Sequence, residues 1–317
     1  MDEFVLIDKY FKPLSRGFGA ALNLTDDAAI IKVPPGSELI ITKDAVSEGL
    51  HFIGNENPAL IARKLLRVNL SDLAAMGAKP LCYFLAVMLP ANTPEAWIKG
   101  FVKGLSEDQK QFHIYLAGGD TISTHGIKSF SITALGTVIK GKALKRSGAK
   151  VGDIIYVSGT LGDSALGLLS LRAKRSNPEL IQRYLLPQPR LALGQKLLGM
   201  ANACMDISDG LVQDLGHICR ASGIGATIYK DALPLSKPAR KLIEKDKKLW
   251  DSVFSGGDDY ELLFTVPKAK KYAIKKLSAA LKLPLTKIGE ITKGKDVKVL
   301  DRAGKTLEIK HKGFRHF

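Results

Sequence analysis

Cysteine is scarce in this sequence, and the three residues that occur are scattered along it. Cys82, Cys204 and Cys219 form no C-x-x-C pair and have no histidine at the spacing of a zinc site. This pattern excludes a disulfide framework and a cysteine-based zinc centre as the basis of the fold. We therefore expect all three to be reduced residues of the hydrophobic core.

Long hydrophobic runs are also missing. The longest, LCYFLAVML, covers nine residues, whereas a membrane-spanning helix needs roughly 20. The first residues, MDEFVLIDKYF, carry acids where a signal peptide has its basic region. These features predict a cytoplasmic protein with no membrane partner.

Aromatic residues make up only 7% of a chain whose formal net charge is +16. Residues 230–317 hold 22 Lys and Arg against 11 Asp and Glu, and a basic segment of this kind is one mark of a nucleic-acid-binding protein. However, the lysines of residues 268–282 are mixed with apolar residues at helical spacing. Because aromatic residues are too few to act as stacking platforms, we expect a solvated helix face and no nucleic-acid partner.

The common nucleotide-binding motifs are absent too. The chain contains no G-x-x-x-x-G-K-[ST] loop and none of the protein-kinase signatures. If the protein binds ATP, it must do so on another scaffold.

The elements that are present alternate between strand-like and helical runs. A length of 317 residues suits two domains, and a break near residues 140–150 is expected to separate them. Strands are predicted near residues 37–44, 82–89, 113–117, 130–139, 153–159, 226–229, 261–266 and 296–300. Helices are predicted after Asn57, after Asn92 or Thr93, near 163–175 and near 268–282.

One long predicted helix has both of its ends marked. Asn57 is the expected N-cap, Pro58 takes the first position, and Gly77 follows the end. Asp72 lies near the C-terminal end, where the helix dipole disfavours an anion by about 0.3–1 kcal/mol. Its neighbours are apolar or small, so this carboxylate needs a partner, and a metal ion would serve. Asn69, one turn earlier on the same face, adds an oxygen.

Other acids follow predicted strands. Asp44 ends the first strand, and Asp120 follows Gly118 and Gly119 just after the strand at residues 113–117. We expect the two glycines to let the backbone approach a ligand closely.

The stretch MDISDGLVQD places three acids within nine positions of this basic chain. Asp206 ends a predicted strand, and Ser208 or Asp209 is expected to cap a helix that begins near Gly210. Asp214 is expected to be an exposed residue of that helix.

A further acidic group, Asp258, Asp259 and Glu261, follows a glycine pair in SGGDDYELLF. Oxygen ligands without His or Cys indicate a hard cation, which favours Mg²⁺ over zinc. Several such groups in one chain suggest a polyphosphate ligand.

Nine motifs follow one another from residue 26 to the C-terminus: DDAAI, DAVSEGLHF, VNLSDLAAMGAKP, AGGDT, RSGAKVGDIIYVSGTLGDSALGL, PQPR, MDISDGL, GGDDYELLF and GFRHF. The set closely resembles the thiamine-monophosphate kinase family of the aminoimidazole ribonucleotide synthetase-like superfamily. The resemblance implies that ATP phosphorylates thiamine monophosphate to thiamine diphosphate in a homodimer that binds several Mg²⁺ ions. It also implies an α+β N-terminal domain, residues 1–145, whose strands form a β-barrel across the dimer. A C-terminal α/β domain, residues 146–317, follows it.

The same resemblance implies roles for single residues. The positions that match metal ligands are Asp27, Thr42, Asp44, Asp72, Asp120, Asp206 and Asp209. Those that match nucleotide contacts are Gly119, Asp120, Arg146 and Ser208, and those that match substrate contacts are His51, Asp259 and Phe314. No residue is assigned as a general base, because a phosphate monoester, with a second pKa of about 6, is already an anionic nucleophile. We expect the acids to hold cations for two polyanionic ligands.

Four residues depart from the family pattern. Thr25 stands where Gly is usual, Lys43 where a small hydroxyl residue is common, Asp258 where Glu is frequent, and Phe314 where Trp is common. Lys43 is expected to alter or replace one metal contact, because it places a cation beside Asp44.

Three related families fit less well. A selenophosphate synthetase would carry a reactive cysteine near its N-terminus, and a hydrogenase-maturation dehydratase would end in a cysteine-bearing tail, whereas this chain ends in GFRHF. The purine-pathway synthetase matches SDGL and GGDDYELLF poorly. The alternatives that remain are another ATP-using member of the superfamily and a non-catalytic metal-binding homologue.

Overall fold

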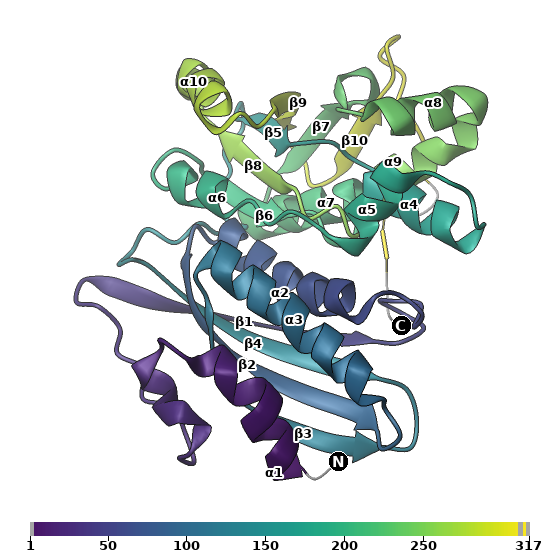
Figure 1. Cartoon of the computed structure of the whole chain (residues 1–317). Coiled ribbons are helices and arrows are strands. Elements are labelled where there is room, and N and C mark those ends of the chain that lie inside the picture. The colour runs from purple at the N-terminus through teal and green to yellow at the C-terminus, as the bar shows by residue number, and fades with distance from the viewer. Residues whose placement is uncertain (1–2, 310–312, 315–317) are drawn as a thin grey trace. The chain divides into compact units, whose positions relative to one another are not determined.

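The computed structural model describes residues 3–309 and 313–314, and the chain forms two compact units (Figure 1). The first unit consists of Met1–Leu73 and Ala78–Gly141, and the second of Ala74–Gly77 and Lys142–Phe317. Both units combine helices with a β-sheet. Within the described ranges, no helix is both long enough and apolar enough to cross a bilayer.

The first unit is built on a four-stranded sheet with the order β1-β4-β2-β3. β4 (Ser129–Ile139) pairs antiparallel with β1 (Ser37–Ser47) and β2 (Lys79–Pro90), whereas β3 (Tyr115–Thr124) runs parallel to β2. Within one chain this sheet is open, with β1 and β3 at its edges, so a single copy does not close the predicted barrel.

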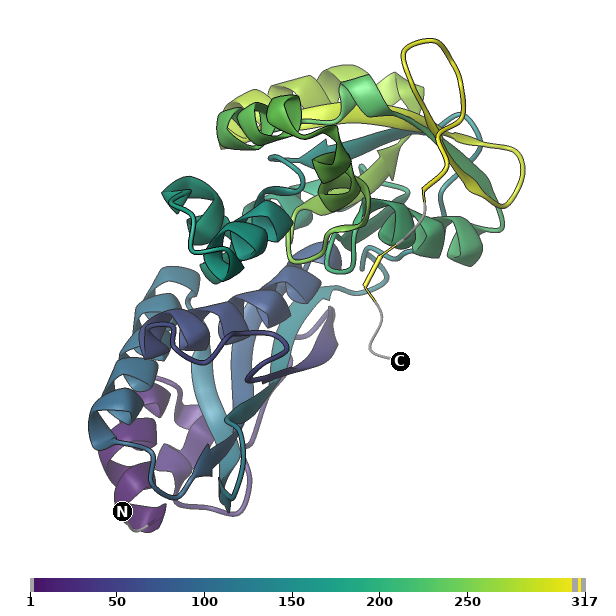
Figure 2. The ribbon, with the colours of Figure 1, turned by 90° about the vertical axis from the view of Figure 1, so that its right-hand side faces the viewer.

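Two helices, α2 (Pro58–Ala75) and α3 (Glu95–Phe112), lie side by side over one face of this sheet (Figures 1 and 2). They are tied together by the buried guanidinium of Arg67, which donates to both carboxylate oxygens of Asp108 at 2.6 and 2.9 Å. The N-terminal segment adds α1 (Glu3–Leu6), a π-helical turn (Ile7–Phe11) and two 3-10 segments (Lys12–Ser15 and Gly19–Leu24).

The predicted ends of α2 are confirmed. Asn57 Oδ1 accepts the N–H of Ala59, and Gly77 has a φ of +72° just beyond the last turn. The predicted cap of α3 is wrong: the helix begins one residue after Pro94, and no side chain caps it.

The second unit contains a six-stranded sheet with the order β10-β7-β9-β5-β8-β6, in which only the β10–β7 pair is parallel. Its strands are β5 (Ile154–Ser158), β6 (Ala203–Asp206), β7 (Gly225–Tyr229), β8 (Leu262–Val266), β9 (Leu285–Thr292) and β10 (Val297–Leu300).

Helices cover both faces of this second sheet, because its strands are apolar on both sides. In β5, Ile155 and Val157 join one core with α4, α5, α7, α8 and α9, whereas Ile154 and Tyr156 join another with α6 and α10. The helices are α4 (Asp163–Arg172), α5 (Pro178–Leu185), α6 (Leu191–Leu197), α7 (Leu211–Ser222), α8 (Lys237–Lys245), α9 (Trp250–Ser255) and α10 (Lys271–Leu281), with 3-10 turns at Lys230–Ala232, Lys247–Leu249 and Lys268–Lys270.

Two predictions about composition are confirmed. The lysine-rich α10 buries Ile274 and leaves its lysines exposed, as expected of a solvated helix face. All three cysteines are buried and unpaired.

Candidate functional site

A cavity of about 450 Å³ lies in the first unit. Three exposed carboxylates, those of Asp26, Asp27 and Asp120, line it together with Gly119. Apolar side chains, among them Phe11 and those of β2 and β3, form much of the remaining wall. The structure thus brings together Asp27, Gly119 and Asp120, to which the sequence analysis gave roles. The cavity wall combines an apolar surface with clustered negative charge.

Gly118 and Gly119, the glycines before Asp120, lie within a strand and not after its end as predicted. β3 continues to Thr124, so Gly118 and Gly119 lie inside the strand and the prediction that it ends before them is wrong. The register between β2 and β3 shifts here, which is a β-bulge. A Cβ on Gly119 would lie 2.0 Å from the carbonyl oxygen of Leu85. The glycine is therefore required by the close approach of two strands, whatever else it contacts.

A second group of predicted residues meets where β1 passes α2. The hydroxyl of Thr42 donates a hydrogen bond to Asp72 Oδ2, and the backbone N–H of Asp44 donates to Asn69 Oδ1 at 3.2 Å. Thr42 and Asp44 share one face of the strand because side chains alternate along it. The structure therefore places Thr42 and Asp44 against the helix that carries Asp72, and Thr42 is one partner of that carboxylate.

Lys43 lies on the opposite face of β1. Its Nζ donates to Thr133 Oγ1 of the neighbouring strand at 3.4 Å, and its side chain is exposed. The expectation that Lys43 interferes beside Asp44 is therefore wrong, because residues 43 and 44 point to different sides of the sheet.

His51 occupies the turn that follows β1. Its Nδ1 accepts the backbone N–H of Ser47 at 3.1 Å, and its carbonyl oxygen accepts from the Nζ of the buried Lys64 at 3.2 Å. Since Nδ1 is an acceptor, the neutral imidazole carries its proton on Nε2. The ring is thus held in one tautomer, with its proton on Nε2.

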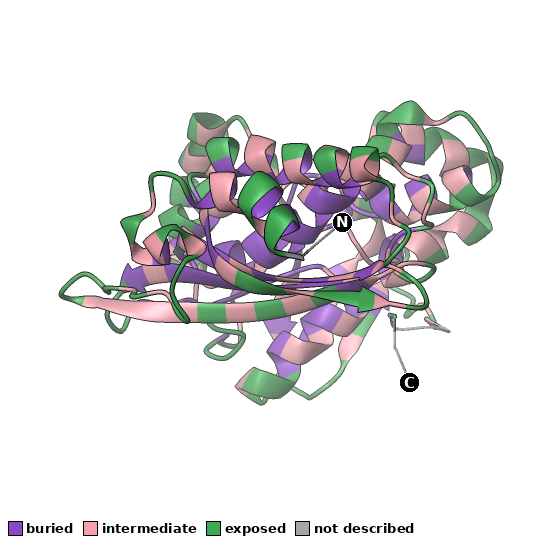
Figure 3. Cartoon of the chain, turned by 60° about the horizontal axis from the view of Figure 1, so that its bottom comes forward, coloured by how far each residue is buried: buried purple, intermediate pink, exposed green. Residues whose placement is uncertain are grey.

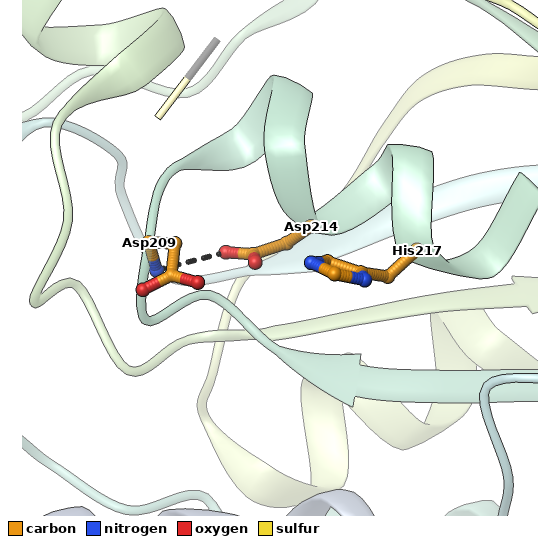
Figure 4. A group of neighbouring side chains, drawn as sticks. All are labelled: Asp209, Asp214 and His217. Carbon is orange, nitrogen blue, oxygen red and sulfur yellow. Dashed lines mark hydrogen bonds between the residues drawn. The ribbon is translucent and has the colours of Figure 1, made fainter. Parts of the chain in front are cut away.

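In the second unit, the loop between β6 and α7 is organised by a residue that the sequence placed wrongly. Asp214 is 1% exposed, and its Oδ2 accepts the backbone N–H groups of Ser208, Asp209 and Gly210 at 3.1, 3.1 and 3.0 Å. Figure 4 shows the bond from Asp209. Asp214 is therefore no exposed helix residue: it holds the loop before α7, and the N-cap of the helix is Gly210 rather than Ser208 or Asp209. Its spacing from Leu211, which also lies on the buried face of α7, was the signal that could have shown this.

The carboxylate of Asp214 is electrostatically strained. Burial, followed by the charge of Asp209, raises its pKa to about 7, although the N–H groups of Gly210 and Asp209 and the charge of Arg146 act in the opposite direction. Its Oδ1 is buried and has no hydrogen-bond partner among the described residues. A nearby cation would therefore be favourable here.

Asp209, Asp214 and His217 have potential ligand atoms within 4.8 Å of one another, and Figure 4 shows the three side chains together. His217 Nδ1 lies 3.0 Å from a guanidinium nitrogen of Arg220. Because arginine can only donate, Nδ1 is an acceptor and the proton is on Nε2. That nitrogen is thus a hydrogen-bond donor, so the oxygens of Asp209 and Asp214 are the better cation ligands, and an all-oxygen set fits Mg²⁺.

Arg146 belongs to the same neighbourhood as this loop. Burial and then the charge of Asp209 have the largest effects on the pKa of Asp214, and the charge of Arg146 acts to lower that pKa. The pKa of His217 is lowered by burial, then by the charge of Arg220, and then by the charge of Arg146. Its guanidinium side chain is exposed. The structure therefore brings Arg146 close to the loop that carries Ser208 and Asp209.

Asp259 is buried, with 2% exposure, and binds the start of α4. Its two oxygens accept the N–H groups of Gly162 at 2.7 Å and Ser164 at 3.3 Å. Burial raises its pKa to about 8, against the effect of the Gly162 N–H, and the charge of Asp163 adds to the increase. These contacts favour a capping role for Asp259 over a contact with substrate.

The neighbouring Asp258 is more accessible. It is half-buried with a φ of +68°, its N–H donates to the carbonyl oxygen of Ser208 at 2.8 Å, and its Oδ1 accepts from the hydroxyl of Tyr260 at 3.2 Å. Asp258 is therefore the acid of this loop that lies beside the predicted nucleotide contact.

Glu261 is fully buried and forms ion pairs. Although burial opposes its ionisation, hydrogen bonds from Arg190 and Ser158 and the charges of Arg190 and Arg183 hold its pKa below the ordinary value. This residue fastens β8 to the segment around α5 and is not available to a ligand.

Phe314 lies at the same loop as Asp209. Its N–H donates to the carbonyl oxygen of Asp209 at 3.0 Å, and its own carbonyl oxygen accepts from Gln213 Nε2 at 2.9 Å. The aromatic residue is 44% exposed. The structure thus joins a predicted substrate contact to a predicted metal ligand more than a hundred positions earlier in the chain.

Both halves of the chain match one protein family. Residues 25–138 match the AIR synthase related protein, N-terminal domain, and residues 150–302 match the AIR synthase related protein, C-terminal domain. The chain is 41% identical to the thiamine-monophosphate kinase of Escherichia coli K12 over 323 residues, which are 99% of this chain and 98% of that protein.

Solved structures agree. The thiamine-monophosphate kinase of Stenotrophomonas maltophilia K279a superposes with a TM-score of 0.86 at 40% identity, covering 97% of this chain and 98% of that one. The complex of AaThiL with AMPPCP and TMP gives a TM-score of 0.80 at 33% identity, covering 99% and 97%. Sequence motifs, fold and the placement of the acidic residues lead to one conclusion: the chain belongs to the AIR synthase-related family and, within it, to the thiamine-monophosphate kinases.

Proposed function

We propose that this protein is an ATP-dependent thiamine-monophosphate kinase, which transfers the terminal phosphoryl group of ATP to the phosphate of thiamine monophosphate. The products are thiamine diphosphate and ADP. The observation that carries this proposal is the 41% identity, over 99% of the chain, to a thiamine-monophosphate kinase. The complex of AaThiL with an ATP analogue and TMP supports it.

We assign the metal-binding positions on the family resemblance, and the chemistry of the donors agrees with it. All of them present oxygen, which suits Mg²⁺, and the buried Oδ1 of Asp214, which has no hydrogen-bond partner among the described residues, supports a cation at the loop carrying Asp209. When bound, Mg²⁺ neutralises the charge of the phosphate oxygens. The proposed ligands are Asp27, Thr42, Asp44, Asp72, Asp120, Asp206 and Asp209.

The nucleotide contacts that we propose are the positions that the family resemblance implies. Gly119 and Asp120 line the cavity of the first unit, and Arg146 and Ser208 lie at the loop of the second. Arg146 is an exposed cation that binds phosphate oxygens and orients them. Since the attacking oxygen of the acceptor is already ionised, these residues need only to position two anions in line.

The substrate contacts are His51, Phe314 and an acid of the GGDD loop. His51 offers its Nε2–H to an anionic group, and Phe314 offers an exposed ring on which the thiamine rings stack. We assign the acid to Asp258 rather than Asp259, because Asp259 is committed to α4. A carboxylate at this position suits the positively charged thiazolium ring of the substrate.

The protein acts as a homodimer in the cytoplasm, with a barrel formed across the dimer. The edge strand β1 is 11 residues long, and Figure 3 shows exposed and half-buried residues alternating along part of it, from Ile41 to Ala45. Ile41 and Ile139 are 60% and 63% exposed. A long, apolar edge strand is a template for pairing with another chain, and β1 of a second copy is the partner that closes the sheet.

The test is ADP formation with purified protein, ATP and Mg²⁺. We expect turnover with thiamine monophosphate, none with unphosphorylated thiamine, and loss of turnover in EDTA. Equal rates with both acceptors would refute the proposal. ATP turnover only with another acceptor would indicate a different member of the superfamily, and metal binding without any turnover a non-catalytic homologue.

A further inference from the structure

One side chain connects the proposed metal ligand Asp209 with Phe314. Gln213, on the first turn of α7, uses its Nε2 to donate to Asp209 Oδ2 at 3.0 Å and to the carbonyl oxygen of Phe314 at 2.9 Å. An amide nitrogen carries two hydrogens, so both bonds are satisfied at once. A third bond, from the N–H of Phe314 to the carbonyl oxygen of Asp209, closes the connection.

The packing around Gln213 is equally close. A Cβ added to Gly313 would lie 2.6 Å from Gln213 Cβ and 2.9 Å from the carbonyl oxygen of Asp209. Contacts at this distance exclude any other side chain at position 313. The backbone at Gly313 and Phe314 is thus fitted to Gln213 and Asp209 and does not merely pass near them.

We propose that Gln213 is a positioning residue that couples metal binding at Asp209 to the seating of Phe314. The inference rests on the proposed function, since it uses the assignment of Asp209 to metal and of Phe314 to substrate. Gln213 holds one carboxylate oxygen of Asp209 and leaves the other for a cation. The orientation of the Asp209 carboxylate that favours the cation is therefore the one in which Gln213 also holds Phe314 in place.

The coupling acts in both directions. Residues that hydrogen-bond a metal ligand typically account for about 10–100-fold in metal affinity. Linkage requires that the seated Phe314 raise metal affinity by the same factor as the metal favours the seated Phe314. Substrate stacked on Phe314 then strengthens metal binding at Asp209. A purely structural glutamine would stabilise the fold equally with and without metal.

The experiment measures hydrogen–deuterium exchange of the Phe314 amide by mass spectrometry of the C-terminal peptide. Wild type is compared in AMPPCP with Mg²⁺ and in AMPPCP with EDTA. We expect Mg²⁺ to slow exchange at this amide by roughly 5-fold or more, which is the usual size of a coupling between sites. In Gln213→Met, which keeps the volume and removes both donors, this dependence on metal should be lost. Gln213→Glu should seat Phe314 still less well, because its acceptors face two other acceptors.

The matched control is Gln182→Met, an exposed glutamine on α5, which should retain the wild-type dependence on metal. In steady-state assays, Gln213→Met should raise KM for thiamine monophosphate roughly 5-fold or more and change kcat less. Retained metal dependence in Gln213→Met, or none in wild type, would overturn the proposal. If the exchange behaves as expected but thiamine monophosphate is not phosphorylated, the coupling stands and the assigned reaction is wrong.

Discussion

Thr42 on β1 donates a hydrogen bond to the carboxylate of Asp72 on α2, so a strand and a helix of the first unit meet at one proposed metal ligand. Asp72 lies near the C-terminal end of α2, where the helix dipole disfavours its charge. The hydroxyl of Thr42 therefore holds the Asp72 carboxylate in place, although its charge remains unfavourable there. We expect substitution of Asp72 to affect the rate and the stability differently.

We expect Asp72→Asn to lower kcat by about 10²-fold or more, comparable to the loss of one preorganised electrostatic group. In EDTA the variant should be as stable as wild type or more stable by roughly 0.5–2 kcal/mol, because its amide oxygen still accepts from Thr42. The measurements are melting curves in EDTA and in Mg·ATP, alongside the rate.

The stabilisation that Mg·ATP gives Asp72→Asn should be smaller than in wild type, since fewer ligands favour the bound state. Asp72→Ala, which loses the hydrogen bond as well, is the control and should melt below Asp72→Asn. If Asp72→Asn itself melts well below wild type in EDTA, Asp72 has a structural role and is no metal ligand.

Phe314 should contribute mainly to substrate binding. Phe314→Ala is expected to raise KM for thiamine monophosphate by an amount worth roughly 1–2 kcal/mol, because a stacked ring is lost. Phe314→Trp should be tolerated, since a larger ring offers the same face. An unchanged KM in the alanine variant would remove Phe314 from the site.

Asp258 and Asp259 should respond differently to the same substitution. Asp258→Asn is expected to raise KM for thiamine monophosphate with little change in stability. Asp259→Asn places an amide donor against the N–H of Gly162 or Ser164 and should cost about 1–3 kcal/mol of stability. Urea unfolding and steady-state kinetics of both variants give the comparison. Were Asp259→Asn stable and impaired only in KM, Asp259 would be the substrate contact after all.

The raised pKa of Asp214 predicts how stability changes with pH in the absence of metal. Its ordinary value is 3.8, and burial together with the charge of Asp209 raises it to about 7. The folded state therefore binds the proton more tightly, so this contribution is fully present below about pH 4 and is lost as the pH rises to about 7.

Asp214→Asn should remove this dependence. Its amide oxygen still accepts from the loop N–H groups, and its NH₂ group takes the place of the unpartnered Oδ1. In EDTA at pH 8 the variant should be more stable than wild type by on the order of 1–3 kcal/mol. Denaturant unfolding at pH 5 and pH 8 measures the effect; identical pH slopes for the two proteins would count against it.

The exposed edge of the first sheet predicts the oligomeric state. Ile41→Lys places a charge on an apolar position of β1 and should convert a dimer into a monomer, as measured by light scattering after gel filtration. Leu169→Lys is the control, because Leu169 is 47% exposed on α4 of the second unit. A dimer that survives Ile41→Lys shows that β1 is not the interface.

Local features of the sequence were enough to place most elements. The N-cap and terminal glycine of α2 mark both of its ends within a few residues, and the apolar runs of β5 and β8 show a strand that is buried on both sides. The mixed α and β content of the family fold follows from such patterns, because each of them depends on neighbours along the chain.

Local sequence patterns could not predict contacts between residues that are distant in the chain. Asp259 binds the N–H of Gly162, 97 positions earlier, at the start of α4, and β3 runs past its two glycines because β2 lies against them. Nothing within a few residues of either position records the partner. The roles expected for single acids therefore needed the family resemblance, and the structure then separated Asp258 from Asp259.

The close approach at Gly119 limits how this protein can be redesigned. A side chain there meets the carbonyl of Leu85, and one at Gly118 meets the ring of Phe84, so libraries that enlarge either position would lose folded protein before they sampled a new nucleotide preference. Ala28 and Thr121 line the same cavity, and both already have a Cβ, so they are not subject to this constraint. Because the proposed nucleotide contacts Gly119 and Asp120 line this cavity, we expect variation at those two positions to change the preference for the phosphoryl donor.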